Sequence, residues 1–191
     1  EIVEGNASNS QDLDRALAGV HTAYYLLHSI NVATDFGDIE SAMAKGFANS
    51  AERQHVQQII YLGGIANDEN RSRHLTSRMN TGTQLASTSV PVLELRAGII
   101  IGSGSASFEM LRHLTHRLPI MTTPKWVSNR TQPIAIRDVL YYLRNAANLA
   151  QRVSRICDIG GPEVVSYATM MQRFAEISGL RKRIIIQVPV L

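Results

Sequence analysis

The sequence predicts an α/β protein built around a doubly wound parallel sheet, with a small C-terminal portion of a second domain. Strand-like and helix-like segments alternate along the chain, which is the pattern of a parallel sheet with crossover helices. Turn residues such as glycine follow most of the strand-like runs. The 191 residues are 45% apolar and 18% charged. This composition is that of a globular protein and excludes a disordered tail or a coiled-coil rod.

The first half of the chain alternates between apolar runs and amphipathic segments. A strand at Glu1–Val3 is expected to precede a helix that Asn9 or Ser10 caps and Gly19 ends. Short apolar runs indicate that the later strands are buried, and these strands are expected at 23–27, 56–62 and 92–95. Helices are expected between them at 37–52 and 71–87, the second weakened by a glycine at position 82.

The second half repeats the alternation with shorter elements. Helices are expected at 108–118, from 137 or 138 to about 150, and at 167–178. Strands are expected at 134–136, 155–159 and 184–188. Pro119 ends the helix expected at 108–118, and Pro133 precedes the strand expected at 134–136.

Charge and hydropathy exclude several classes of function. The net charge is +3, and the only tight basic cluster is Arg181–Arg183, without interleaved aromatic residues, so no nucleic-acid partner is predicted. Apolar runs such as Ala97–Ile101 are far shorter than the roughly 20 residues that span a bilayer, so no membrane partner is predicted. The single cysteine, Cys157, forms no internal disulfide, and a cytoplasmic location is expected.

Candidate ligand-binding residues follow the strands. Parallel sheets with crossover helices bind ligands beyond the carboxyl ends of their strands. We therefore expect a ligand to lie against small or polar residues at these places, namely Asn6, Leu27, His28, Ser29, Gly64, Ala97 and Gly98. The alternative is that these residues only close turns.

Five segments in order resemble the extended or atypical short-chain dehydrogenases/reductases. They are Tyr24–Ser29, Ile59–Gly64, Leu93–Gly98, Gln132–Val139, and Ile159–Pro162 with the following Ser166-Tyr167. Over nearly the whole chain the sequence is similar to the NmrA-like and epimerase-type NAD(P)-binding proteins. The resemblance implies a Rossmann-type sheet, NAD or NADP as the cofactor, and a small-molecule substrate that the sequence does not identify.

The glycine-rich turn by which that family holds a pyrophosphate is missing from these residues. Glu1–Asn6 resembles the third strand of the family's sheet, so the first two strands are expected upstream. Residues 1–118 are therefore expected to form a Rossmann-type domain lacking its first βαβ unit. Residues 119–191 are expected to return to the sheet and contribute to a small substrate domain.

The family's catalytic Tyr and Lys, four residues apart on one helix, correspond here to His74 and Arg78. Positions i and i+4 share one helical face. A histidine can exchange protons near neutral pH, and an arginine can donate several hydrogen bonds to ribose or phosphate. His74 and Arg78 are thus the candidate catalytic residues, and Arg78 is also a candidate cofactor ligand. The alternative is a solvated helix face.

Two classes of function remain open from the sequence. The first is an NAD(P)-dependent oxidoreductase or sugar-nucleotide epimerase-like enzyme, and the second is a non-catalytic dinucleotide-binding sensor like the NmrA-like proteins. The replaced Tyr and Lys favour the second modestly. No metal site is predicted, because His113 and His116 have no third ligand at a suitable spacing. The sequence leaves the choice between monomer and homo-oligomer open.

Overall fold

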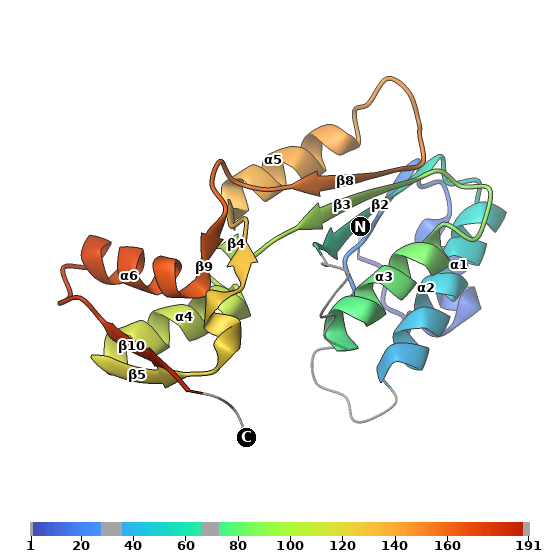
Figure 1. The fold of residues 1–191 in the computed structure, drawn as a ribbon. Coiled ribbons are helices and arrows are strands. Elements are labelled where there is room, and N and C mark those ends of the chain that lie inside the picture. Colours follow the sequence, from blue (N-terminus) through green and yellow to red (C-terminus); the bar gives the residue numbers. More distant parts are fainter. Residues whose placement is uncertain (1, 28–35, 66–72, 189–191) are drawn as a thin grey trace. The chain divides into compact units, whose positions relative to one another are not determined.

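The computed structural model describes residues 2–27, 36–65 and 73–188 (Figure 1). The chain divides into two compact units, of which the first holds residues 1–96 and 141–158 and the second holds residues 97–140 and 159–191. The boundaries follow Arg96, Leu140 and Asp158, and the second of them falls within helix α5 (Ile136–Ala146). Each unit has a hydrophobic core of its own.

The main sheet has the strand order β1-β2-β3-β8. Its strands are β1 (Thr22–Tyr25), β2 (Gln58–Gly64), β3 (Val92–Ala97) and β8 (Arg155–Ile159). β1 and β2 are parallel, with Ala23 opposite Ile59. Figure 1 shows β2, β3 and β8 side by side and running in the same direction. The prediction of an α/β fold with a parallel sheet is confirmed.

Three helices precede or separate the strands of the first unit. α1 (Ser10–Leu17) precedes β1, α2 (Phe36–Arg53) lies between β1 and β2, and α3 (Arg73–Leu85) lies between β2 and β3. Of the two predicted caps of α1, Asn9 is the N-cap: its side-chain oxygen accepts hydrogen bonds from the backbone N–H groups of Gln11 (2.8 Å) and Asp12 (3.3 Å). Gly19, with φ of 72°, follows the helix, as expected of a terminating glycine.

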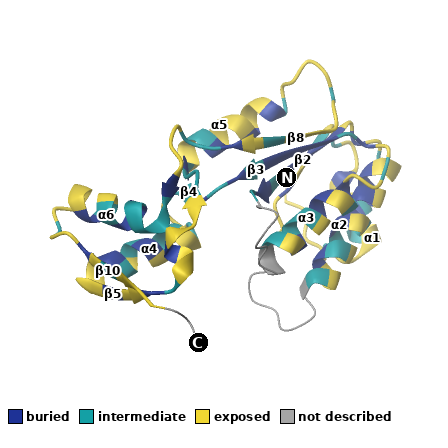
Figure 2. Ribbon diagram, in the orientation of Figure 1, coloured by how far each residue is buried: buried dark blue, intermediate teal, exposed yellow. Residues whose placement is uncertain are grey.

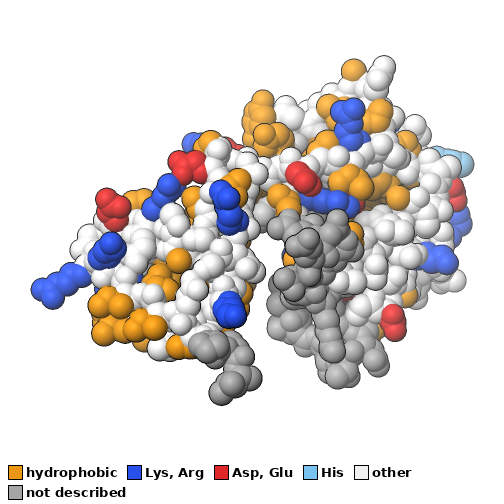
Figure 3. Space-filling model, in the orientation of Figure 1, with side chains coloured by type: hydrophobic (Ala, Val, Ile, Leu, Met, Phe, Trp, Pro, Cys, Tyr) orange, Lys and Arg blue, Asp and Glu red, His pale blue; other side chains and the backbone are white. Residues whose placement is uncertain are grey.

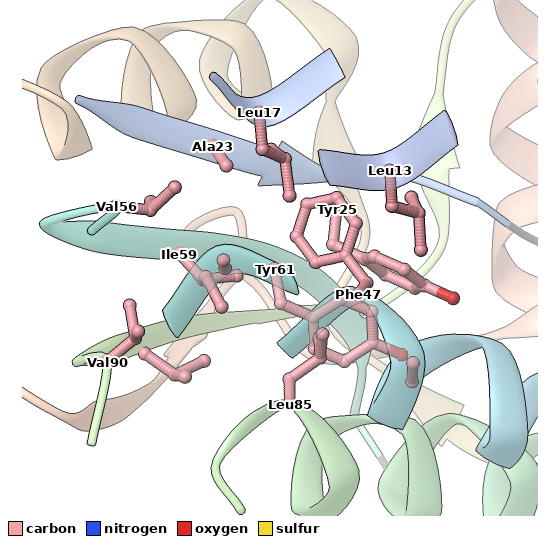
Figure 4. Packing of buried hydrophobic residues seen from close by; sticks show 13 residues of the cluster. Leu13, Leu17, Ala23, Tyr25, Phe47, Val56, Ile59, Tyr61, Leu85 and Val90 are labelled. Atoms are coloured by element: carbon pink, nitrogen blue, oxygen red, sulfur yellow. The ribbon is translucent and has the colours of Figure 1, made fainter. Parts of the chain in front are cut away.

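Alternate residues of β1 and β2 pack against these helices (Figure 4). Tyr25 lies at the centre, with its ring centroid 5.1 Å from that of Phe47 and 6.1 Å from that of Tyr61. Ile59 and Leu85 are fully buried in the same cluster. Figure 2 shows β2 and β3 buried over most of their length. β2 and β3 therefore form the buried centre of the sheet, and their last residues form its carboxyl edge.

The second unit contains helices α4 (Ala106–Arg117) and α6 (Tyr167–Ile177) and three two-stranded pairings. The parallel pairs are β5 (Ile120–Thr123) with β10 (Ile184–Gln187) and β4 (Ile100–Ile101) with β7 (Ile134–Ala135). The antiparallel pair is β6 (Arg130–Thr131) with β9 (Val165–Ser166), and a short 3₁₀ helix covers Lys125–Ser128.

The predicted strand at Glu1–Val3 is wrong for the residues that the structure describes. Residues 2–6 form no strand, and Ile2 is 98% exposed. A strand exists only as part of a ladder, and no described segment pairs with these residues. The other predicted elements exist, most with shifted ends: β2 includes both Gly63 and Gly64, and α3 continues through Gly82. The strands β4, β5, β6 and β9 were not predicted.

Lys and Arg side chains are dispersed among neutral and acidic ones on the face shown in Figure 3. No helix in the described ranges combines the length and hydropathy needed to cross a bilayer. Cys157, on β8, is half-buried and free.

Candidate functional site

The carboxyl end of β2 lies directly beneath α3. A Cβ atom placed on Gly64 would lie 3.4 Å from Leu75 Cδ2 and 3.5 Å from both Cδ and Nη1 of Arg78. The guanidinium of Arg78 therefore covers the backbone where the strand ends. Arg78 is half-buried, and among the residues that the structure describes its side chain has no ion pair or hydrogen bond. A half-buried cation without a partner indicates a place for an anion.

Tyr61, on β2, is hydrogen-bonded to the turn of α3 that carries Arg78. Its hydroxyl donates a hydrogen bond of 3.0 Å to the backbone carbonyl of Arg78. Burial raises the pKa of Tyr61, although the positive charge of Arg78 opposes the shift. The phenol therefore stays protonated and acts as a donor, so α3 is fixed to β2 at the level of Arg78.

A buried ion pair lies beside these residues on β3. Glu94 Oε1 accepts a hydrogen bond of 2.8 Å from Arg96 Nε, and their side chains are 7% and 24% exposed. Two glycines leave the space for this carboxylate: a Cβ atom on Gly82 would lie 2.5 Å from Oε2, and one on Gly63 would lie 2.9 Å from Oε1. The glycines on β2 and α3 thus permit a carboxylate to sit between strand and helix.

A second buried carboxylate lies between α2 and α3. The Ser77 hydroxyl donates a hydrogen bond to Glu40, and both residues are buried. Burial, with a smaller contribution from the Glu40 charge, raises the pKa of Tyr25 to about 12. α3, the helix that carries Arg78, is therefore hydrogen-bonded to β2 through Tyr61 and to α2 through Ser77 and Glu40.

Asn6 and Leu27, two of the predicted ligand residues, lie at the surface. Asn6 is occupied in the turn before α1: its N–H donates to Asp12 Oδ2 (2.9 Å) and its Oδ1 accepts from the N–H of Ser8 (2.9 Å). Leu27, beyond the end of β1, is 43% exposed. His28 and Ser29 lie outside the described residues, and the ligand role of all four residues stays a prediction.

Three further predicted residues lie at element ends. His74 is in the first turn of α3, but its side chain lies outside the described part. Ala97 is buried at the last position of β3. Gly98 follows it, and a Cβ atom there would lie 2.4 Å from the carbonyl oxygen of Gln132. Gly98 therefore has a packing reason to be glycine, and its role toward a ligand stays a prediction.

A separate cavity of about 290 Å³ lies at the amino ends of β2 and β3. It is lined by residues before these strands and by one arginine: Glu52, His55, Val56, Gln57, Ser89, Val90, Pro91 and Arg152. Glu52 is engaged there with Ser89, accepting hydrogen bonds from its N–H (2.9 Å) and its hydroxyl (2.6 Å). None of the residues predicted to bind a ligand lines this cavity.

Glu94 and Arg96 were not predicted from the sequence. The signal is present in Leu93–Ala97, where two charged residues alternate inside a run that is otherwise apolar. Charged residues are rarely fully buried unless they are paired, so this alternation marks an ion pair inside a strand. In the described ranges, no group of three or more His, Cys, Asp or Glu residues is placed to hold a metal ion.

Comparison with known proteins shows the fold and not the family. No family model matches the sequence, and no curated protein matches it. The structure is similar to UDP-N-acetylglucosamine 4-epimerase from Bacillus cereus, with a TM-score of 0.76 and 13% identity over 97% of this chain and 72% of that one. The chain therefore has the Rossmann-type fold of such enzymes.

Two other solved structures agree. The Bordetella bronchiseptica enzyme WbmG, in complex with NAD and UDP, gives a TM-score of 0.78 and 12% identity, covering 98% of this chain and 67% of that one. A double mutant of the dTDP-glucose 4,6-dehydratase DesIV from Streptomyces venezuelae, with NAD and DAU bound, gives 0.77 and 13%, covering 98% and 66%.

Proposed function

We propose that the chain is a dinucleotide-binding protein that takes NAD(H) or NADP(H) at the carboxyl edge of its main sheet. The observation that carries the proposal is the half-buried guanidinium of Arg78, which lies over the backbone of Gly64 and has no partner among the described residues. Ligands of doubly wound sheets bind at this edge. Two of the structures with this fold contain NAD, which supports the choice of cofactor.

The residues of this chain provide contacts for only part of a bound dinucleotide. Gly64 allows close approach to the backbone, and Arg78 can donate hydrogen bonds to ribose or phosphate oxygens. The sequence has no Gly-x-Gly-x-x-Gly turn for the pyrophosphate. When bound, a nicotinamide dinucleotide supplies or accepts a hydride. The protein's contribution is to place the ligand against the edge of β2.

Replacing Arg78 with methionine is expected to weaken NADH binding by about tenfold or more, since hydrogen bonds to charged groups contribute about 1.5–3 kcal/mol. The affinity is measured by calorimetry. Arg53→Met is the control, because Arg53 forms an exposed ion pair with Asp14 (2.8 Å) on the same unit. Equal NADH affinity of the Arg78 variant and the parent protein would contradict the proposal.

The second candidate function is an epimerase-like or dehydratase-like oxidoreductase. The neighbours named above favour it, whereas His74 and Arg78 stand where the short-chain dehydrogenase/reductase pattern has Tyr and Lys. A general acid or base contributes about 10²- to 10⁴-fold to the rate. We expect His74→Phe to leave NADH affinity and any turnover of sugar nucleotides nearly unchanged. A hundredfold fall in turnover, with NADH affinity preserved, would establish His74 as the proton donor instead.

A further inference from the structure

A second guanidinium, that of Arg96, lies near the carboxyl end of β3. Glu94 and Arg96 are two residues apart on one face of β3, which corresponds to about 6.6 Å along the strand. Gly82 contacts Glu94, and Arg78 precedes Gly82 by four residues, or about 6 Å along the helix. α3 follows β2 in the chain and runs back from the carboxyl end of that strand. Going from Gly82 to Arg78 along α3 therefore leads toward the carboxyl edge of the sheet. Going from Glu94 to Arg96 along β3 leads toward the same edge.

Both arginines near this edge keep side-chain N–H donors that are unused among the described residues. Glu94 accepts from Nε of Arg96 only, and the two terminal amino groups of Arg96 have no hydrogen-bond partner among the described residues. The Arg78 guanidinium has no such partner there either. Arg78 and Arg96 therefore both have donors to offer a ligand, and the buried carboxylate of Glu94 orients Arg96.

We propose that Arg78 and Arg96 together bind an oxyanion group of the ligand, a phosphate or a carboxylate, with Glu94 holding Arg96 in place from below. Paired guanidinium groups bind such anions through several charge-assisted hydrogen bonds. The inference rests on the proposed function for the choice of this edge as the ligand site. It goes beyond that function by assigning Arg96 as a binding residue and by requiring an anionic group at the edge of β3.

The test is a titration with inorganic phosphate, followed by the shift in backbone and Arg Nε NMR signals. The parent protein is expected to bind phosphate at this edge. Arg96→Met and Arg78→Met are each expected to weaken that binding about tenfold or more. Arg112→Met is the matched control, because Arg112 also pairs with a glutamate, Glu109 (2.7 Å), but on exposed α4. Unchanged phosphate affinity in the Arg96 variant would overturn the proposal.

Arg96→Met leaves a buried carboxylate without its partner, and the variant is expected to lose stability for that reason alone. The double variant Glu94→Gln, Arg96→Met removes the lone charge as well, and it is expected to show the same loss of phosphate affinity with a folded spectrum.

A parallel titration with NADH separates the two proposals. Phosphate that competes with NADH identifies the cofactor's own phosphate as the anion, and phosphate that binds beside NADH identifies a substrate group. Phosphate binding without any NADH binding would sustain the two-arginine site and refute the dinucleotide proposal.

Discussion

Replacing Tyr61 with alanine is expected to lower the free energy of unfolding by about 3–5 kcal/mol, as for other large aromatic side chains in cores. Tyr61 is fully buried between β2 and the helices, with its ring 6.1 Å from that of Tyr25. Its hydroxyl also bonds to the carbonyl of Arg78 at 3.0 Å. The substitution therefore removes both core packing and the attachment of α3.

Denaturant unfolding measures this effect, and two variants separate its parts. Tyr61→Phe keeps the ring but removes the donor, so a loss of about 1 kcal/mol is expected. Tyr141→Ala removes a tyrosine that is 66% exposed, and a change within about 0.5 kcal/mol is expected. A Tyr61→Ala variant as stable as Tyr141→Ala would show that the core under the site is wrongly assigned.

Gly82→Ala is expected to destabilise the protein by about 1–3 kcal/mol, although alanine is the better helix former. The new Cβ atom would lie 2.5 Å from Oε2 and 3.0 Å from Cδ of Glu94. The carboxylate would have to move from its pocket and from Arg96. This would also weaken phosphate binding, because the restraint on Arg96 is lost.

Gly46→Ala is the matched control for Gly82→Ala. Gly46 is also within a helix, α2, but a Cβ atom there meets only Leu13 Cδ1, at 3.9 Å. This variant is expected to gain about 0.4–1 kcal/mol because alanine restricts the unfolded chain. Opposite signs in thermal unfolding of the two variants are the expected outcome. A gain in both would mean that Glu94 does not occupy the space under Gly82.

Most elements could be predicted because their apolar spacing agrees with their environment. The strand at Arg155–Ile159 was predicted with the observed bounds, and α2 differs by one residue at each end. Local pattern is least informative for short pairings such as β6 with β9, two residues each, because they depend on partners far along the chain. The strand expected at Glu1–Val3 failed for the same reason: its pattern is extended, but no described segment pairs with it.

The candidate site was predicted only in part. The rule that ligands bind beyond the strand ends led to Gly64, and a family resemblance led to Arg78. Neither source pointed to Glu94 and Arg96, because their pairing depends on space that two glycines from other elements leave open. A sequence shows where a glycine stands but not which side chain occupies the space beside it.

The central claim is that the carboxyl edge of β2 and β3 is the ligand site. Titrating the ¹⁵N-labelled protein with NADH at millimolar concentration tests it most directly, through the backbone signals that move. The account predicts that the signals of Gly63, Gly64, Arg78 and Arg96 shift together with a single dissociation constant. Shifts confined to Glu52, His55 and Arg152, which line the cavity at the opposite ends of the strands, would contradict it.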